Sequence, residues 1–181
     1  MPAYLSLLSP FRYSFDYYSL HVLQSKDTTV ITMQLFTKIV NTQAIPLTLS
    51  ILKKSLPSIL QSQCFNDKKL PFSEELQETE VGHLFEHILL EYLCISKLSH
   101  GYKRASYSGV TNWNWRKDPW GTFHITIYTG IKDVTILPKA LGKSIDLTNS
   151  ILQTVPHDNT SSHEPAYTYS PLPLISLSQN V

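Results

Sequence analysis

Two stretches of the chain alternate apolar and polar residues with a period of two, as half-buried strands do. In the first, residues 17–23 and 29–35 flank a short polar turn, and both runs are rich in β-branched and aromatic residues. In the second, residues 106–115 and 122–128 flank a turn that contains proline and glycine. Each stretch therefore predicts a β-hairpin.

Three other stretches have the 3.6-residue period of a helix. They are residues 42–61, which Pro57 kinks or divides, residues 81–98, and residues 131–153. Thr79 is placed to cap the N-terminus of the second helix. That helix is apolar over much of its circumference, so we expect it to be central. Its main apolar stripe is Val81, Leu84, Phe85, Ile88, Tyr92 and Ile95.

The order of these elements is β-β-α-α-β-β-α. It predicts an α+β domain in which an antiparallel sheet of two hairpins has helices packed on one face. We assign this domain to residues 1–154. Residues 155–181 are rich in Pro, Ser and Thr and have no periodicity, so they are interpreted as a flexible tail.

Composition narrows the classes of function. The net charge of +1 gives no case for a nucleic-acid partner or an anionic membrane surface. No apolar run is long enough to span a bilayer. The first ten residues lack the positive region of a signal peptide, so we expect a cytoplasmic protein. The sequence leaves open whether the protein forms a homo-oligomer.

The chemistry of the chain is concentrated in His83-Leu84-Phe85-Glu86-His87, within the central helix. Histidines four apart lie on one helical face, where their imidazoles can converge on a zinc ion. Glu86 lies at the edge of that face and can accept a proton from a zinc-bound water. The order inverts the common zinc-protease motif. Alternatively, these side chains are merely solvated or hydrogen-bonded, but a polar line on a buried helix is costly unless it is paired or ligating.

The two cysteines, Cys64 and Cys94, form no Cys-x-x-Cys pair. A thiolate metal site is therefore not expected. We interpret both as reduced, packed thiols, with a disulfide as the less favoured alternative.

The chain resembles the N-terminal domain of cyanophycin synthetase over roughly residues 15–153. The resemblance is carried by a Leu-Pro segment at 56–60, by Cys64 and Phe72, and above all by the Gly-His-x-x-Glu-His-x-x-x-Glu helix within residues 78–91. It implies a metallopeptidase-like domain. In cyanophycin synthetase that domain is implicated in binding and cutting cyanophycin, an aspartate backbone bearing arginines, to make primers.

The resemblance implies roles for particular residues. His83 and His87 would ligate Zn²⁺, and Glu86 would be the general base. Glu91 matches a motif position as a third ligand, although its place along the helix suits orientation of a histidine equally well. His124, on the clearest strand, is an alternative third ligand.

Residues 103–120 depart from the family pattern. Lys103, Arg104 and Arg116 are candidates to receive substrate carboxylates, with a solvated basic loop as the alternative. Trp113 is a candidate for stacking on substrate, with a core or edge-strand role as the alternative. The sequence contains no ligase domain, so we expect a standalone domain that does not synthesise polymer.

The sequence thus predicts a zinc-dependent hydrolase that cleaves a peptide or isopeptide bond. The resemblance implies cyanophycin or a related Asp/Arg polymer as its substrate. A non-catalytic module that binds a peptide polymer through a degenerate metal site is the alternative. A purely structural protein is the third.

Overall fold

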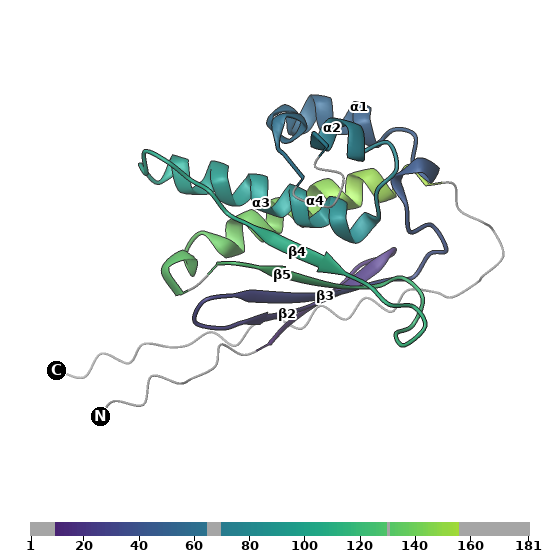
Figure 1. Cartoon of the computed structure of the whole chain (residues 1–181). Coiled ribbons are helices and arrows are strands. Elements are labelled where there is room, and N and C mark those ends of the chain that lie inside the picture. Colours follow the sequence, from purple (N-terminus) through teal and green to yellow (C-terminus); the bar gives the residue numbers. More distant parts are fainter. Residues whose placement is uncertain (1–9, 65–69, 130, 156–181) are drawn as a thin grey trace.

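Five strands form one antiparallel sheet, and the helices cover one of its faces (Figure 1). The computed structural model describes residues 10–64, 70–129 and 131–155. In the sheet the strand order is β1-β2-β3-β5-β4. This arrangement confirms the predicted α+β class. The strands are β1 (Phe11–Ser14), β2 (Tyr18–Gln24), β3 (Thr29–Leu35), β4 (Gly109–Asn112) and β5 (Thr122–Ile127).

The two predicted hairpins become one sheet because β3 pairs with β5, with Ile31 opposite Ile125. The short edge strand β1 was not predicted. Its four residues pair with β2, and most of their side chains are exposed, so it has little hydrophobic pattern of its own. Its strand conformation depends on the backbone hydrogen bonds that β2 offers.

The helical layer is more divided than the sequence predicts. Pro57 starts a separate 3₁₀ helix, as its expected effect on residues 42–61 implies. In the last helical stretch, a 3₁₀ turn precedes the helix proper. The α-helices are α1 (Thr48–Ser55), α2 (Phe72–Glu75), α3 (Val81–Ser99) and α4 (Leu137–Leu152), and the 3₁₀ helices are η1 (Thr42–Ala44), η2 (Pro57–Gln61) and η3 (Ile131–Asp133).

The core lies between the sheet and the helices. Alternate residues of the three inner strands face the helices and are buried, because successive side chains of a strand point to opposite faces. Helix α3 lies against β4 and β5, and α4 packs beside it (Figure 1). The buried apolar strand residues are Tyr18, Leu20, Val22, Ile31, Met33, Leu35, Phe123, Ile125 and Ile127.

Helix α3 approaches the sheet closely at Gly82. A Cβ atom added there would lie 2.3 Å from Cγ of Phe123, on β5. Real Cβ atoms do not tolerate such a distance, so glycine permits the backbone of α3 to rest on the Phe123 ring. This contact fixes both the height and the rotation of the helix that carries the histidines.

The predicted tail lies almost wholly outside the described residues. Its first residue, Val155, is described, and its side chain is buried in the core. The boundary after residue 154 otherwise stays a prediction.

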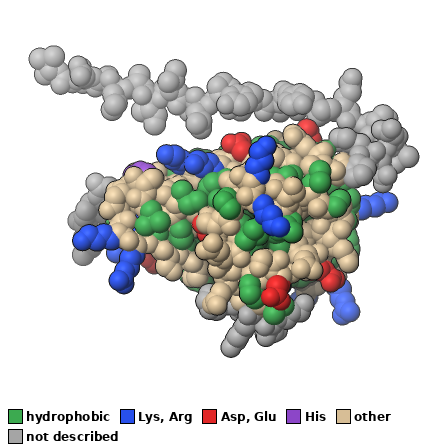
Figure 2. Space-filling view, turned by 90° about the horizontal axis from the view of Figure 1, so that it is seen from above, with side chains coloured by type: hydrophobic (Ala, Val, Ile, Leu, Met, Phe, Trp, Pro, Cys, Tyr) green, Lys and Arg blue, Asp and Glu red, His purple; other side chains and the backbone are tan. Residues whose placement is uncertain are grey.

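Among the described residues, no helix combines the length and apolar composition that crossing a bilayer requires. On the face seen from above the helices, Lys and Arg side chains are scattered among hydrophobic and polar ones (Figure 2). They form no single basic patch there.

We predict that Gly82→Ala destabilises the protein by about 1–3 kcal/mol, because the new methyl group overpacks against Phe123. Chemical denaturation measures the change in the free energy of unfolding. The matched control is Gly142→Ala in α4, where an added Cβ has no atom within 4 Å. There the higher helix propensity of alanine should stabilise by up to about 1 kcal/mol. Equal effects at both positions would contradict the close approach at Gly82.

Candidate metal centre

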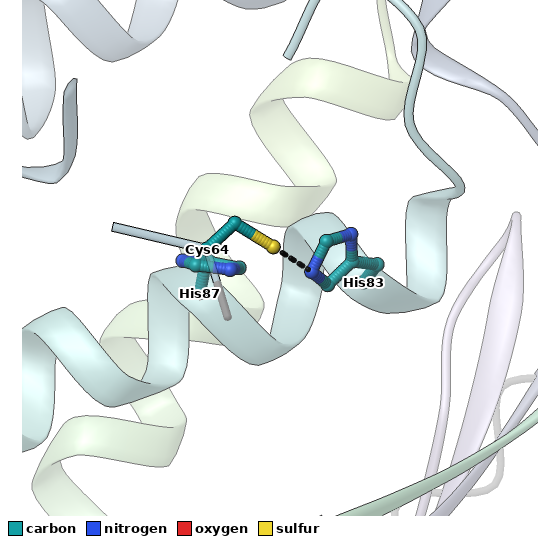
Figure 3. Close-up of side chains that lie close together, drawn as sticks. All are labelled: Cys64, His83 and His87. Atoms are coloured by element: carbon teal, nitrogen blue, oxygen red, sulfur yellow. Dashed lines mark hydrogen bonds between the residues drawn. The ribbon is translucent and has the colours of Figure 1, made fainter. Parts of the chain in front are cut away.

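Three side chains converge where the segment after η2 passes over α3. The Sγ atom of Cys64 and one ring nitrogen each from His83 and His87 all lie within 4.8 Å of one another. Both histidines project from α3 toward the sulfur (Figure 3). These residue types and distances could hold a metal ion, and within the described residues this is the one such group.

His83 is oriented by a hydrogen bond on each ring nitrogen. Its Nδ1 lies 2.7 Å from Oγ1 of Thr79, and its Nε2 lies 3.3 Å from Sγ of Cys64. Thr79 is itself held by Thr42, which exchanges two hydrogen bonds with it. The tautomer with the proton on Nδ1 leaves the Nε2 lone pair facing the sulfur, as a metal ligand requires. Thr79 thus orients the histidine, and the N-cap position of α3 is occupied by Glu80, without a side-chain capping hydrogen bond, in place of the expected Thr79.

His87 is held by packing. Its ring stacks on Phe72 of α2, with centroids 3.9 Å apart and an interplanar angle of 16°. Its Nδ1 lies 3.4 Å from Oγ of Ser62. Burial, followed by the nearby His83, lowers the pKa of His87 to about 3. Burial also lowers the pKa of His83, against the opposing charge of Glu75. Both rings are therefore neutral at neutral pH, which is the form that binds metal.

Cys64 corrects the expectation that neither cysteine belongs to a metal site. Its side chain is buried, and a backbone hydrogen bond from its N–H to the Leu70 carbonyl, at 3.3 Å, fixes the segment locally. Cys94 forms no disulfide and does not belong to the group. The Cys-x-x-Cys criterion missed this residue because the fold brings Cys64 next to the two histidines, so that no second cysteine is needed nearby in the sequence.

The other predicted ligands lie elsewhere. Glu91 is on α3, two turns beyond His83, and is not part of the group because the helix carries it too far along the axis. His124 lies on β5 between the buried Phe123 and Ile125, so its side chain is on the opposite face of the sheet. There its Nε2 is 3.2 Å from Oδ2 of Asp118.

Glu86 lies on the sheet side of α3. Its Oε2 accepts a 2.5 Å hydrogen bond from Oγ1 of Thr111, on β4. A Cβ added to Gly109 would lie 2.9 Å from Oε1 of Glu86, so the glycine leaves room for this carboxylate. Burial raises the pKa of Glu86 to about 7, and the Thr111 hydrogen bond opposes that rise. A carboxyl group with such a pKa can both accept and release a proton near neutral pH.

A cavity of about 830 Å³ is lined by Cys64, His83, His87 and Glu86 together. Trp113 also lines it, with its indole 39% exposed. Lys103, Arg104 and Arg116 are exposed and do not line it. Of the side chains predicted to contact substrate, the structure therefore brings only Trp113 to the cavity that holds the candidate metal group.

One protein-family model matches the part of the chain that contains this group. Residues 30–113, from β3 to just beyond β4, match the model of the cyanophycin synthase-like N-terminal domain. Over these residues the chain is similar to that domain. The match confirms the resemblance found in the sequence, and it includes all three members of the candidate metal group of this domain. The chain matches no curated protein and no solved structure.

We predict that Cys64→Ser weakens Co²⁺ binding more than about a hundredfold, because it removes the only sulfur donor of the group. Titration of the metal-free protein, followed by the sulfur-to-cobalt charge-transfer absorption, measures the loss. Cys94→Ser is the matched control and should keep both the affinity and the absorption. Full retention of both in Cys64→Ser would exclude the thiol as a ligand.

Proposed function

We propose that this domain is a zinc-dependent hydrolase that cleaves a peptide or isopeptide bond. The observation that carries the proposal is that three metal-type donors and the Glu86 carboxyl group line one cavity. No other cluster of donors competes with it among the described residues.

The donor set fits zinc. Two imidazoles and one thiolate are ligands that Zn²⁺ prefers, and neutral rings need no deprotonation before they bind. Three protein ligands are also the usual number in catalytic zinc sites, which keep one position open for water or substrate. A structural site, by contrast, is normally closed by a fourth protein ligand, and the described residues supply none at this group.

The residues of the proposed active site would have distinct roles. Cys64, His83 and His87 would hold the zinc ion, which when bound polarises a carbonyl group and makes water more acidic. Glu86 would accept a proton from the attacking water and pass it to the leaving amine. Thr111 positions the carboxylate for both transfers through its hydrogen bond to Oε2. Phe72 keeps one side of the His87 ring out of water by stacking on it.

For the substrate, we propose cyanophycin or a related Asp/Arg polymer. The family match supports this choice. The charges on the cavity wall also support it, because the described residues that line the wall include carboxyl groups and no Lys or Arg. Such a wall suits the guanidinium groups of the polymer better than its carboxylates. Lys103, Arg104 and Arg116 then have no assigned part in recognition within the cavity.

We predict that Glu86→Gln keeps zinc and reduces cleavage by about 10²–10⁴-fold, because glutamine preserves the shape but cannot transfer the proton. The zinc-loaded protein is mixed with cyanophycin, and the lengths of the products are followed by gel electrophoresis. Zinc content, measured by mass spectrometry, is the control for an intact site.

Undiminished cleavage by Glu86→Gln would remove this residue from its assigned role. If wild-type protein cleaves nothing, and its affinity for the polymer is unchanged by a chelator, the domain is a binding module instead.

A further inference from the structure

Strand β4 lies at an edge of the sheet, and its residues line the cavity. Among the strands that the structure describes, β4 pairs only with β5. Gly109, Val110 and Thr111 line the same cavity as the candidate metal group. Gly109 has no side chain, so its part of the wall consists of main-chain atoms, and these are partly exposed. The cavity therefore reaches the backbone of an edge strand.

The register with β5 shows which main-chain groups of β4 are left over by the sheet. The N–H group of Tyr128 donates a 2.9 Å hydrogen bond to the Ser108 carbonyl, and the register continues unbroken along β4. In an antiparallel pair, residues that bond to the neighbouring strand alternate with residues that do not. Val110 therefore bonds to β5 as Ser108 does. The N–H and C=O groups of Gly109 and Thr111 point away from β5, toward the free edge.

Strand β4 has none of the features that usually protect an edge strand from pairing. Such features are lysine, proline or a bulge. The sequence of β4 is Gly-Val-Thr-Asn, without charge or proline, and its register with β5 contains no bulge. The opposite edge strand, β1, carries Arg12 and does not line the cavity. The edge that is suited to pairing is thus the one beside the candidate site.

The two residues with outward-pointing main-chain groups also contact the proposed proton-transfer group. Thr111 donates a 2.5 Å hydrogen bond to Oε2 of Glu86, and a Cβ added to Gly109 would lie 2.9 Å from Oε1. The carboxyl group of Glu86 therefore lies against both residues. Because paired strands are about 4.8 Å apart, a chain that pairs with this edge would run beside that carboxyl group.

We propose that the free edge of β4 binds the main chain of the polymer substrate as an added strand. This role rests on the proposed function, because it takes the cavity to be the substrate site. An edge strand recognises main-chain amides, and the aspartate backbone of a cyanophycin-like polymer supplies them. The N–H and C=O groups of Gly109 and Thr111 pair with the polymer and hold its backbone beside Glu86.

The first test compares peptides that differ only in where methyl groups block main-chain amides. The probes are acetylated aspartate tetramers that bear arginines, and calorimetry measures their binding to the metal-free full-length chain, so that turnover plays no part. One probe is unmethylated, one is N-methylated at its second and fourth residues, and one at its second and third.

The two methylated probes should differ in affinity. An added strand uses every second residue, so alternate methylation leaves one complete set of amides, whereas adjacent methylation blocks an amide in either register. The probe with adjacent methyl groups should therefore bind about tenfold more weakly than the probe with alternate ones. Because both carry the same number of methyl groups, each is the matched control of the other.

The second test locates the contact on the protein by hydrogen exchange followed by NMR. Saturation with the unmethylated tetramer should slow amide exchange at Gly109 and Thr111 by at least about tenfold, because new hydrogen bonds protect these groups. The amides of β1 are the internal control, since that edge does not line the cavity, and they should exchange as in the free protein.

Three results would overturn the role of β4. They are no binding of the unmethylated tetramer, equal affinity for the two methylated probes, and unchanged exchange at Gly109 and Thr111 in the saturated protein. If the probes and the exchange behave as expected but the zinc-loaded protein cleaves nothing, the role of β4 stands and the hydrolase proposal fails. If zinc-dependent cleavage occurs and one of the three results is found, the hydrolase stands and the role of β4 fails.

Discussion

The contact between Gly82 and Phe123 determines which way every functional side chain of α3 points. Successive residues of an α-helix are rotated by about 100°, so Glu86 is about 40° from Gly82 around the axis, and His83 and His87 are about 100° and 140° from it. With Gly82 on the sheet, Glu86 faces β4 and the histidines face away, toward Cys64 and Phe72. One glycine therefore separates the proton-transfer group from the metal-type ligands.

Burial then gives these side chains their chemical character. The same low-dielectric surroundings keep His83 and His87 neutral and bring the pKa of Glu86 to about 7. Opposite effects on acid and base follow from one cause, because burial disfavours the charged form of each. The Thr79 and Thr111 hydroxyls then fix the orientation of one histidine and of the carboxylate. The hydrophobic core thus both stabilises the fold and prepares the site.

Local pattern was sufficient to predict the two main hairpins, the central helix and the pair His83 and His87, because each depends on residues close in sequence. It was not sufficient for β1, because this strand is held by its pairing with β2 and has little hydrophobic pattern of its own. It also missed Cys64, since this residue lies 19 positions before His83, on the far side of helix α2 in the sequence. Glu91 was predicted as a ligand because it matches a motif position of the resembling family, and a motif within one helix says little about a neighbouring segment.

The position of β5 in the sheet has a consequence for how the chain folds. Residues 122–127 insert between β3 and β4, although they are made after α3 and after every residue of the candidate metal group. During synthesis the thiol and both imidazoles therefore leave the ribosome before Phe123, the surface on which their helix rests. Contacts between residues so distant in sequence form late in folding, because closing long loops is slow. We therefore expect the site to be complete only once β5 has inserted between β3 and β4.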